Sequence, residues 1–143
     1  MPPFKGFDFQ IELPHGSTDE STYAFAFPGR GSFRPSVVVK TERLGEPIQL
    51  EAYVEKQLGT LEQVLPKLVV ASGTSITHDD LPAYVSVFDW GEPEKRVRQK
   101  QRYIVLRDPA RIVTITGTHL REDFDQADAL FDAVFKSFHA GEK

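Results

Sequence analysis

Apolar residues recur at three- and four-residue steps through the segment Gln49–Leu65, and charged or polar residues occupy most positions between them. This spacing places the apolar side chains on one side of an α-helix. Gln57 interrupts the apolar side, and Pro66 ends the helix from just beyond its last residue. The same spacing predicts a second amphipathic helix over Asp123–His139, with acidic residues in its first turns.

Strands are predicted where apolar and polar positions alternate, or where short apolar runs lie between turn-forming residues. The last three predicted strands follow one another through tight turns, which indicates an antiparallel meander. The predicted strands are Phe7–Leu13, Thr22–Phe27, Ser36–Lys40, Leu68–Ser72, Ala83–Trp90, Lys95–Leu106 and Arg111–Thr118.

These elements predict an α+β domain in which the helix Gln49–Leu65 crosses an antiparallel sheet. The chain has 143 residues and no repeat, linker or low-complexity segment, so a single domain over residues 1–143 is expected. Some strand segments, such as Ser36–Val39, are apolar on both faces, although a sheet with one solvated face should alternate. Either one sheet face is incompletely covered and forms an apolar binding groove, or the sheet and loops cover it internally.

The composition argues against several classes of function. A net charge of −4 argues against a general nucleic-acid binder. The absence of Cys excludes disulfides, thiol nucleophiles and cysteine metal sites. The N-terminal residues lack the apolar core of a signal peptide, and no apolar run is long enough to span a membrane. A cytoplasmic protein without stable membrane insertion is therefore expected.

No strong catalytic or metal-binding pattern is present in the sequence. The four histidines are far apart and show neither HxH nor HExxH spacing. His78 stands beside Asp79 and Asp80, which indicates either a solvated turn or a metal site. There is no Gly-x-Ser-x-Gly elbow and no dinucleotide-binding fingerprint. We therefore expect no enzymatic activity, no catalytic residue, no cofactor and no bound metal.

The long strand Lys95–Leu106 has two different faces. Gln101 lies on the face that also carries Tyr103, and Gln57 lies on the apolar side of the first helix. A buried amide needs hydrogen-bond partners. Either nearby backbone groups satisfy each amide or it lies at the edge of the core, or both amides line an apolar groove and bond to a guest segment. The other face of the strand is basic, and it is either solvated or bound to an anionic partner. Its residues are Arg96, Arg98, Lys100 and Arg102.

The order of these elements and several short motifs resemble the DcrB-like family. The most specific motif is the helix segment Tyr53-Val-x-x-Gln57-Leu, in a helix that ends in Leu65-Pro66. The other motifs are Ile11-Glu-Leu-Pro14, Phe27-Pro28, Ser36-Val-Val-Val39, Gln99-x-Gln101, Thr114-Ile-Thr116 and the final aromatic helix. The resemblance spans nearly the whole chain and implies a PsbP-like α/β sandwich, in which two main helices pack on one face of a curved antiparallel sheet.

Members of that family without signal peptides resemble the Eag chaperones of type VI secretion, which pair up and hold hydrophobic N-terminal transmembrane segments of toxic effectors. The resemblance therefore implies a cytoplasmic chaperone or adaptor that forms a homodimer and binds a transmembrane segment of an effector in a concave groove. The alternative is a small-ligand or lipid-binding module of the same fold, without a role in secretion. The residues implied to line the groove are Asp8, Thr22, Ala24, Ser36, Val38, Gln57, Gln101 and Tyr103.

Overall fold

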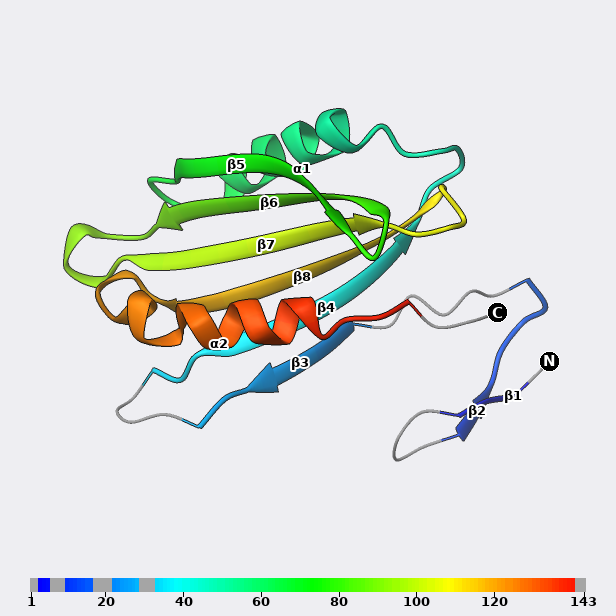
Figure 1. Cartoon of the computed structure of the whole chain (residues 1–143). Helices are drawn as coiled ribbons and strands as arrows, with labels where there is room; N and C mark the ends of the chain where they lie inside the picture. The colour runs from blue at the N-terminus through cyan, green and yellow to red at the C-terminus, as the bar shows by residue number, and fades with distance from the viewer. Residues whose placement is uncertain (1–2, 6–9, 17–21, 29–32, 141–143) are drawn as a thin grey trace.

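Six antiparallel strands form the main sheet, in the order β3-β4-β8-β7-β6-β5 (Figure 1). The computed structural model describes residues 3–5, 10–16, 22–28 and 33–140. The strands are β1 (Pro3–Lys5), β2 (Gln10–Glu12), β3 (Thr22–Ala26), β4 (Ser36–Arg43), β5 (Val69–His78), β6 (Leu81–Trp90), β7 (Val97–Val105) and β8 (Arg111–Leu120). The helices are α1 (Leu50–Val64) and α2 (Phe124–Lys136), with short 3₁₀ helices η1 (Pro93–Lys95) and η2 (Arg121–Asp123).

The helix α2 packs across one face of the sheet, and the larger hydrophobic core lies between them. Phe131 and Phe135 of α2 are fully buried in this core, together with Ile104 of β7 and Ile115 of β8. Gly117 of β8 lies directly against the helix, because a Cβ atom there would stand 2.9 Å from two atoms of the Phe131 ring. This close approach explains why a glycine occupies a central strand.

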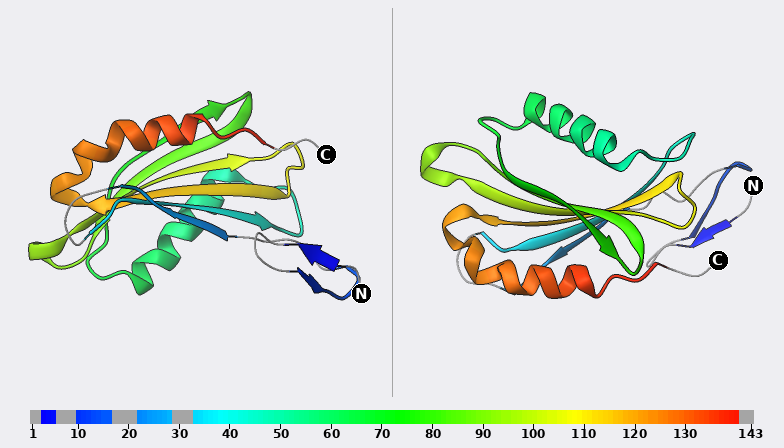
Figure 2. Two further views of the ribbon diagram at one scale, coloured as in Figure 1. Left: turned by 90° about the horizontal axis from the view of Figure 1, so that it is seen from below. Right: turned by 45° about the horizontal axis from the view of Figure 1, so that its top comes forward.

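The helix α1 packs on the opposite face, where a smaller core joins Val54 to Tyr103 and Ile112. Figure 2 shows the two helices on either side of the sheet. The α+β class and the curved antiparallel sheet are confirmed, but the prediction that both helices pack on one face is wrong. Strand β7 explains the difference, since Tyr103 and Val105 face α1 while Ile104, between them, faces α2.

The predicted helices differ from α1 and α2 by only a few residues at their ends. Neither is long and apolar enough to cross a membrane, and the same holds for every helix in the described residues. The strand predicted over Leu68–Ser72 is longer in the structure and extends to His78 as β5. Within the predicted strand Phe7–Leu13, the described residues form a strand only at Gln10–Glu12, which pairs with β1 outside the main sheet.

Candidate functional site

The sheet face on which α1 packs (the α1 face) brings together the strand residues that the resemblance implied, except Asp8, which lies outside the described residues. Ala24 of β3 stands opposite Val38 of β4. In the same row, Val38 stands opposite Thr116 of β8, and Thr116 stands opposite Gln101 of β7. Cross-strand partners share one sheet face, so these side chains form a row across it. The neighbouring rows of this face hold the others, which are Thr22, Ser36 and Tyr103.

The helix α1 covers only part of the α1 face. It packs over Tyr84 and Tyr103, and it reaches β4 where the Tyr53 hydroxyl donates a hydrogen bond to Glu42 at 3.3 Å. On the far side of β4, every residue of β3 is exposed, and Val38 is only half-buried. Figure 2 shows α1 crossing the sheet away from β3. The uncovered part, here named the open strip, consists of the α1-face residues Thr22, Ala24, Ala26, Ser36 and Val38.

A chain of side-chain hydrogen bonds runs along the α1 face beside the open strip. The Tyr103 hydroxyl donates to the amide oxygen of Gln101, and Gln101 Nε2 donates to the Thr116 hydroxyl at 3.2 Å. The partners of Gln101 are therefore two side chains of the same sheet face, Tyr103 and Thr116, and not the backbone groups that the sequence suggested. Within the described part of the chain, one amide hydrogen of Gln101 and the hydroxyl hydrogen of Thr116 have no acceptor and are available to a bound molecule.

Gln99 repeats this arrangement in the next row and was missed as a site residue. Trp90 Nε1 donates to its amide oxygen at 3.0 Å, and Gln99 Nε2 donates to the Thr118 hydroxyl at 2.9 Å. The signal was present in the sequence, because Gln99 and Gln101 are two residues apart and so share one face of a strand. Two parallel rows of amide and hydroxyl groups therefore border the open strip.

Gln57 is a polar residue on the side of α1 that packs against the sheet. It is half-buried and follows Tyr53 by one helical turn, so it lies on the flank of α1 that reaches toward β4. Its side chain makes no hydrogen bond among the residues that the structure describes. The amide of Gln57 is therefore free to bond with a guest, whereas the amide of Gln101 is largely occupied.

The phenols beside this network stay protonated at neutral pH. Burial raises the pKa of Tyr103 well above its usual value. Burial, with the charge and hydrogen bond of Glu42, raises the pKa of Tyr53 to about 12. The two rings meet edge to face, with centroids 6.1 Å apart. Because the Tyr103 hydroxyl keeps its proton, it donates, and the direction of the hydrogen bond to the Gln101 oxygen is fixed.

The basic face of β7 is not solvated, because α2 covers it, and the interpretation as an outer face is wrong. Arg98 donates two hydrogen bonds to Asp89, at 2.7 and 3.0 Å. Lys100 is held between Asp128 and Asp132 of α2, at 3.0 and 2.7 Å. The charges of Arg98 and Lys100 are thus neutralised within the fold.

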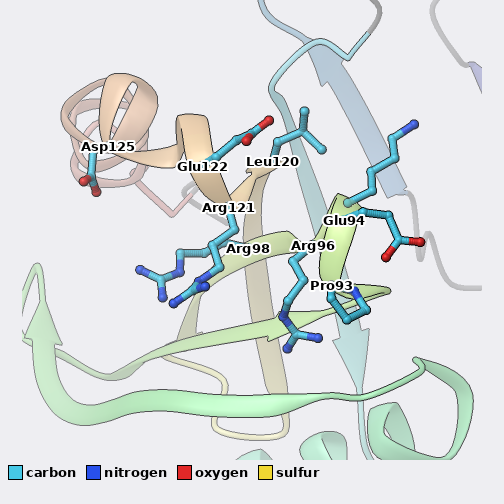
Figure 3. Close-up of a pocket in the computed structure, with 9 residues that line it drawn as sticks. Pro93, Glu94, Arg96, Arg98, Leu120, Arg121, Glu122 and Asp125 are labelled. Carbon is cyan, nitrogen blue, oxygen red and sulfur yellow. The ribbon is translucent and has the colours of Figure 1, made fainter.

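A small cavity of about 330 Å³ lies at the end of this basic face, near the start of α2 (Figure 3). Arg96, Arg98 and Arg121 line it, and Figure 3 shows the guanidinium groups of Arg98 and Arg121 close together, with that of Arg96 apart from them. Arg96 donates to two backbone carbonyl groups, and Arg121 shares Asp89 with Arg98 at 3.1 Å. Burial raises the pKa of Asp89, but its hydrogen bonds to Arg98 and the nearby positive charges outweigh burial and lower it. These contacts serve the fold itself.

His78 has no ring nitrogen left for a metal. Arg102 donates to Nδ1 at 3.0 Å, and in the matching tautomer Nε2 donates to the Phe138 carbonyl at 2.7 Å. Asp79 bonds to His139 at 2.7 Å. Hydrogen bonds from His78 and Asp79 therefore hold the segment that follows α2 against the end of β5 and the turn after it. Among the residues that the structure describes, no group of three or more His, Asp or Glu side chains could hold a metal ion.

The model of the DcrB family matches residues 9–137, which is most of the chain. The chain belongs to the DcrB family. This confirms the resemblance that the motifs around Gln57 and Gln101 indicated. No curated protein sequence is significantly similar to this DcrB-family protein.

Solved structures confirm the PsbP-like fold. A Pseudomonas aeruginosa protein of unknown function, PA94, described as a putative regulator, matches with a TM-score of 0.79 at 18% identity, over 99% of this chain and 97% of its own. LpqN of Mycobacterium tuberculosis, described as involved in cell envelope biogenesis, has a TM-score of 0.55 at 14% identity, over 78% and 79%. CyanoP, the PsbP of Synechocystis sp. PCC 6803, has a TM-score of 0.54 at 14% identity, over 92% and 86%. At these identities the likeness establishes the fold alone.

Proposed function

We propose that this DcrB-family protein is a cytoplasmic chaperone or adaptor that binds a hydrophobic helix along the open strip. The occupant proposed is a transmembrane segment of a type VI secretion effector, held before export. The observation that carries the proposal is a strip of small and apolar side chains that the chain's own helices leave uncovered, bordered by rows of hydrogen-bonding groups.

The size of the side chains in the open strip supports a helix as the occupant. Thr22, Ala24 and Ala26 are small, which allows a helix backbone to approach β3 closely, as small residues do between membrane helices. Each square ångström of apolar helix surface removed from water stabilises the complex by about 25 cal/mol. A transmembrane segment in water has a large surface of this kind to cover.

The bordering polar groups support a specific orientation of the guest. The hydroxyl groups of Thr116 and Thr118 accept from Gln101 and Gln99 and donate to no other described residue, and the amide of Gln57 lies on α1, which packs beside the strip. These groups match carbonyl and hydroxyl groups that a helix exposes beside its small residues. A homodimer, in which two such strips hold two segments, is part of the proposal. Catalysis, nucleic-acid binding and stable membrane insertion are not.

The test is co-expression of the full chain with a hydrophobic helical segment fused to a soluble reporter, followed by co-purification. Ala24→Arg places a charge on an exposed position of the strip, and recovery of the reporter should fall by about tenfold or more, because burying an unpaired charge is costly. Gln57→Leu should reduce recovery about fivefold, the equivalent of one hydrogen bond.

The matched control is Gln63→Leu, the same substitution at an exposed position of the same helix. Gln63→Leu should leave recovery at the wild-type level. Unchanged recovery with Ala24→Arg, in a variant whose circular dichroism is that of the wild type, would contradict the proposal. Native mass spectrometry that found a lipid on the wild type, lost in Ala24→Arg, would instead favour the small-ligand alternative.

A further inference from the structure

A second cavity, on the opposite side of the sheet from the open strip, combines an apolar floor with positive charge at its rim. It lies beyond the C-terminal end of α2 and has a volume of about 880 Å³. This volume falls within the usual range of small-molecule sites, about 300 to 1,000 Å³. Its floor consists of Leu81, Leu106, Val113 and Phe138. Leu81 and Val113 are buried members of the core beneath α2, and Leu106 and Phe138 pack against that core.

The cavity exists because α2 is shorter than the sheet that it covers. The helix ends at Lys136, and the next residues are fastened to the turn between β5 and β6. His78 binds the carbonyl group of Phe138, and Asp79 binds His139. On the α2 face, no helix in the described part of the chain therefore covers the start of β8 or the turn that precedes it. Leu106 and Phe138 are only half-buried there, above the buried side chains of Leu81 and Val113.

Two arginines at the rim have hydrogen-bond donors that no described residue uses. Arg107 and Arg111 line the cavity, and neither side chain makes an ion pair or hydrogen bond among the described residues. The carboxylates nearby are already engaged, since Asp108 accepts a hydrogen bond from Arg43 at 2.8 Å and Asp79 is bonded to His139. The charge of Arg111 helps to lower the pKa of Asp108, so that carboxylate balances Arg111 in part. The rim therefore offers two guanidinium groups whose hydrogen-bond donors are unused within the described residues, above an apolar floor.

We propose that this cavity binds an anionic amphiphile, with an alkyl chain on the floor and a carboxylate or phosphate head at Arg107 and Arg111. The fork of a guanidinium group matches the geometry of both head groups. An apolar floor within a pocket of this size fits an alkyl chain. This site uses the opposite sheet face and shares no residue with the open strip, so it stands independently of the proposed helix binding.

The test is isothermal titration calorimetry of the full chain with four probes: dodecanoate, dodecyl phosphate, dodecanol and inorganic phosphate. We expect saturable binding, with one site per chain, for dodecanoate or dodecyl phosphate. The tighter of the two identifies the head group. Dodecanol lacks the charge and inorganic phosphate lacks the chain, so each should bind at least about tenfold more weakly. Absence of saturable binding by both anionic probes, or equal binding of dodecanol, would overturn the proposal.

Substitutions of residues that line the cavity test where the anionic probe binds. The double variant Arg107→Gln with Arg111→Gln should weaken binding of the anionic probe by about tenfold or more. Thr41→Trp, which fills the cavity from β4, should abolish it. Lys40→Gln, the matched control, removes one exposed charge on the α1 face and should change nothing. Wild-type affinity in both cavity variants would overturn the assignment. Gln57→Leu should leave this binding unchanged, so failure of either proposed site is a separate result.

Discussion

The hydrogen bond between Tyr103 and Gln101 makes a quantitative prediction about stability. Tyr103 is 1% exposed, and its hydroxyl donates to the amide oxygen of Gln101. Gln101→Leu removes this acceptor and leaves a buried hydroxyl unpaired, which costs about 1–3 kcal/mol. The same substitution also removes the hydrogen bond to Thr116. We therefore expect Gln101→Leu to lower the free energy of unfolding by roughly 2 kcal/mol.

A second substitution distinguishes a lost hydrogen bond from lost packing. Tyr103→Phe removes the hydroxyl, and in the double variant with Gln101→Leu both partners of the bond are gone. Replacing both partners by apolar groups is nearly neutral, so the double variant should recover about half or more of the stability lost by Gln101→Leu alone. The two substitutions should thus be non-additive, with a coupling of about 1 kcal/mol.

Urea unfolding followed by circular dichroism measures these differences as shifts of the midpoint at constant slope. The matched control is Gln57→Leu, a half-buried amide without a side-chain hydrogen bond, which should change stability by less than about 0.5 kcal/mol. The reasoning would be refuted if Gln101→Leu were as stable as the wild type, or if the double variant were no more stable than Gln101→Leu.

Further predictions concern the packing of α2 on the sheet, with a glycine of α1 for comparison. Gly117→Ala places a methyl group 2.9 Å from the buried ring of Phe131 and should destabilise the fold by about 1–3 kcal/mol in urea unfolding. Gly59→Ala, at an open position of α1, should instead stabilise it by about 0.5–1 kcal/mol, and equal effects would contradict the packing argument. The pKa of Asp89 is lowered in the folded state, so its contribution is present above the unfolded value of about 3.8 and is lost as pH falls below it. Asp89→Asn should therefore destabilise the fold at pH 7 and flatten the acid limb of a stability–pH curve, and an unchanged limb would contradict this.

The sequence predicted the local structure of the candidate site because alternation assigns faces within a strand. Gln101 and Tyr103 were placed on one face by their spacing alone, and the structure puts them there. The pairing of that face with Val38 and Ala24 depends on the register between strands far apart in the chain. Spacing within one segment contains no information about register, so only the family resemblance could bring these residues together.

The partners of the basic row could not be predicted for a related reason. Asp89 lies on β6, and Asp128 and Asp132 lie on α2, so each ion pair depends on how elements pack. The side on which each helix packs was also not determined by its own pattern. An apolar stripe shows which side of a helix is buried, but strands that are apolar on both faces accept a helix on either.

The two faces of the sheet differ in how their polar groups are satisfied, and this difference favours a protein guest on the α1 face. Under α2, the charges of Arg98 and Lys100 are paired internally by carboxylates. On the α1 face, the polar groups of the two rows are neutral amides and hydroxyls, and some of their hydrogens are unused by the residues that the structure describes. Neutral donors beside small side chains suit the backbone and hydroxyl groups of a helix, which keep hydrogen-bonding capacity within an apolar surface. A pure alkyl chain would leave those donors unpaired and would bury them at a cost.

The cavity beyond α2 has the opposite composition, with charged guanidinium groups over an apolar floor, and there an anionic amphiphile is the better match.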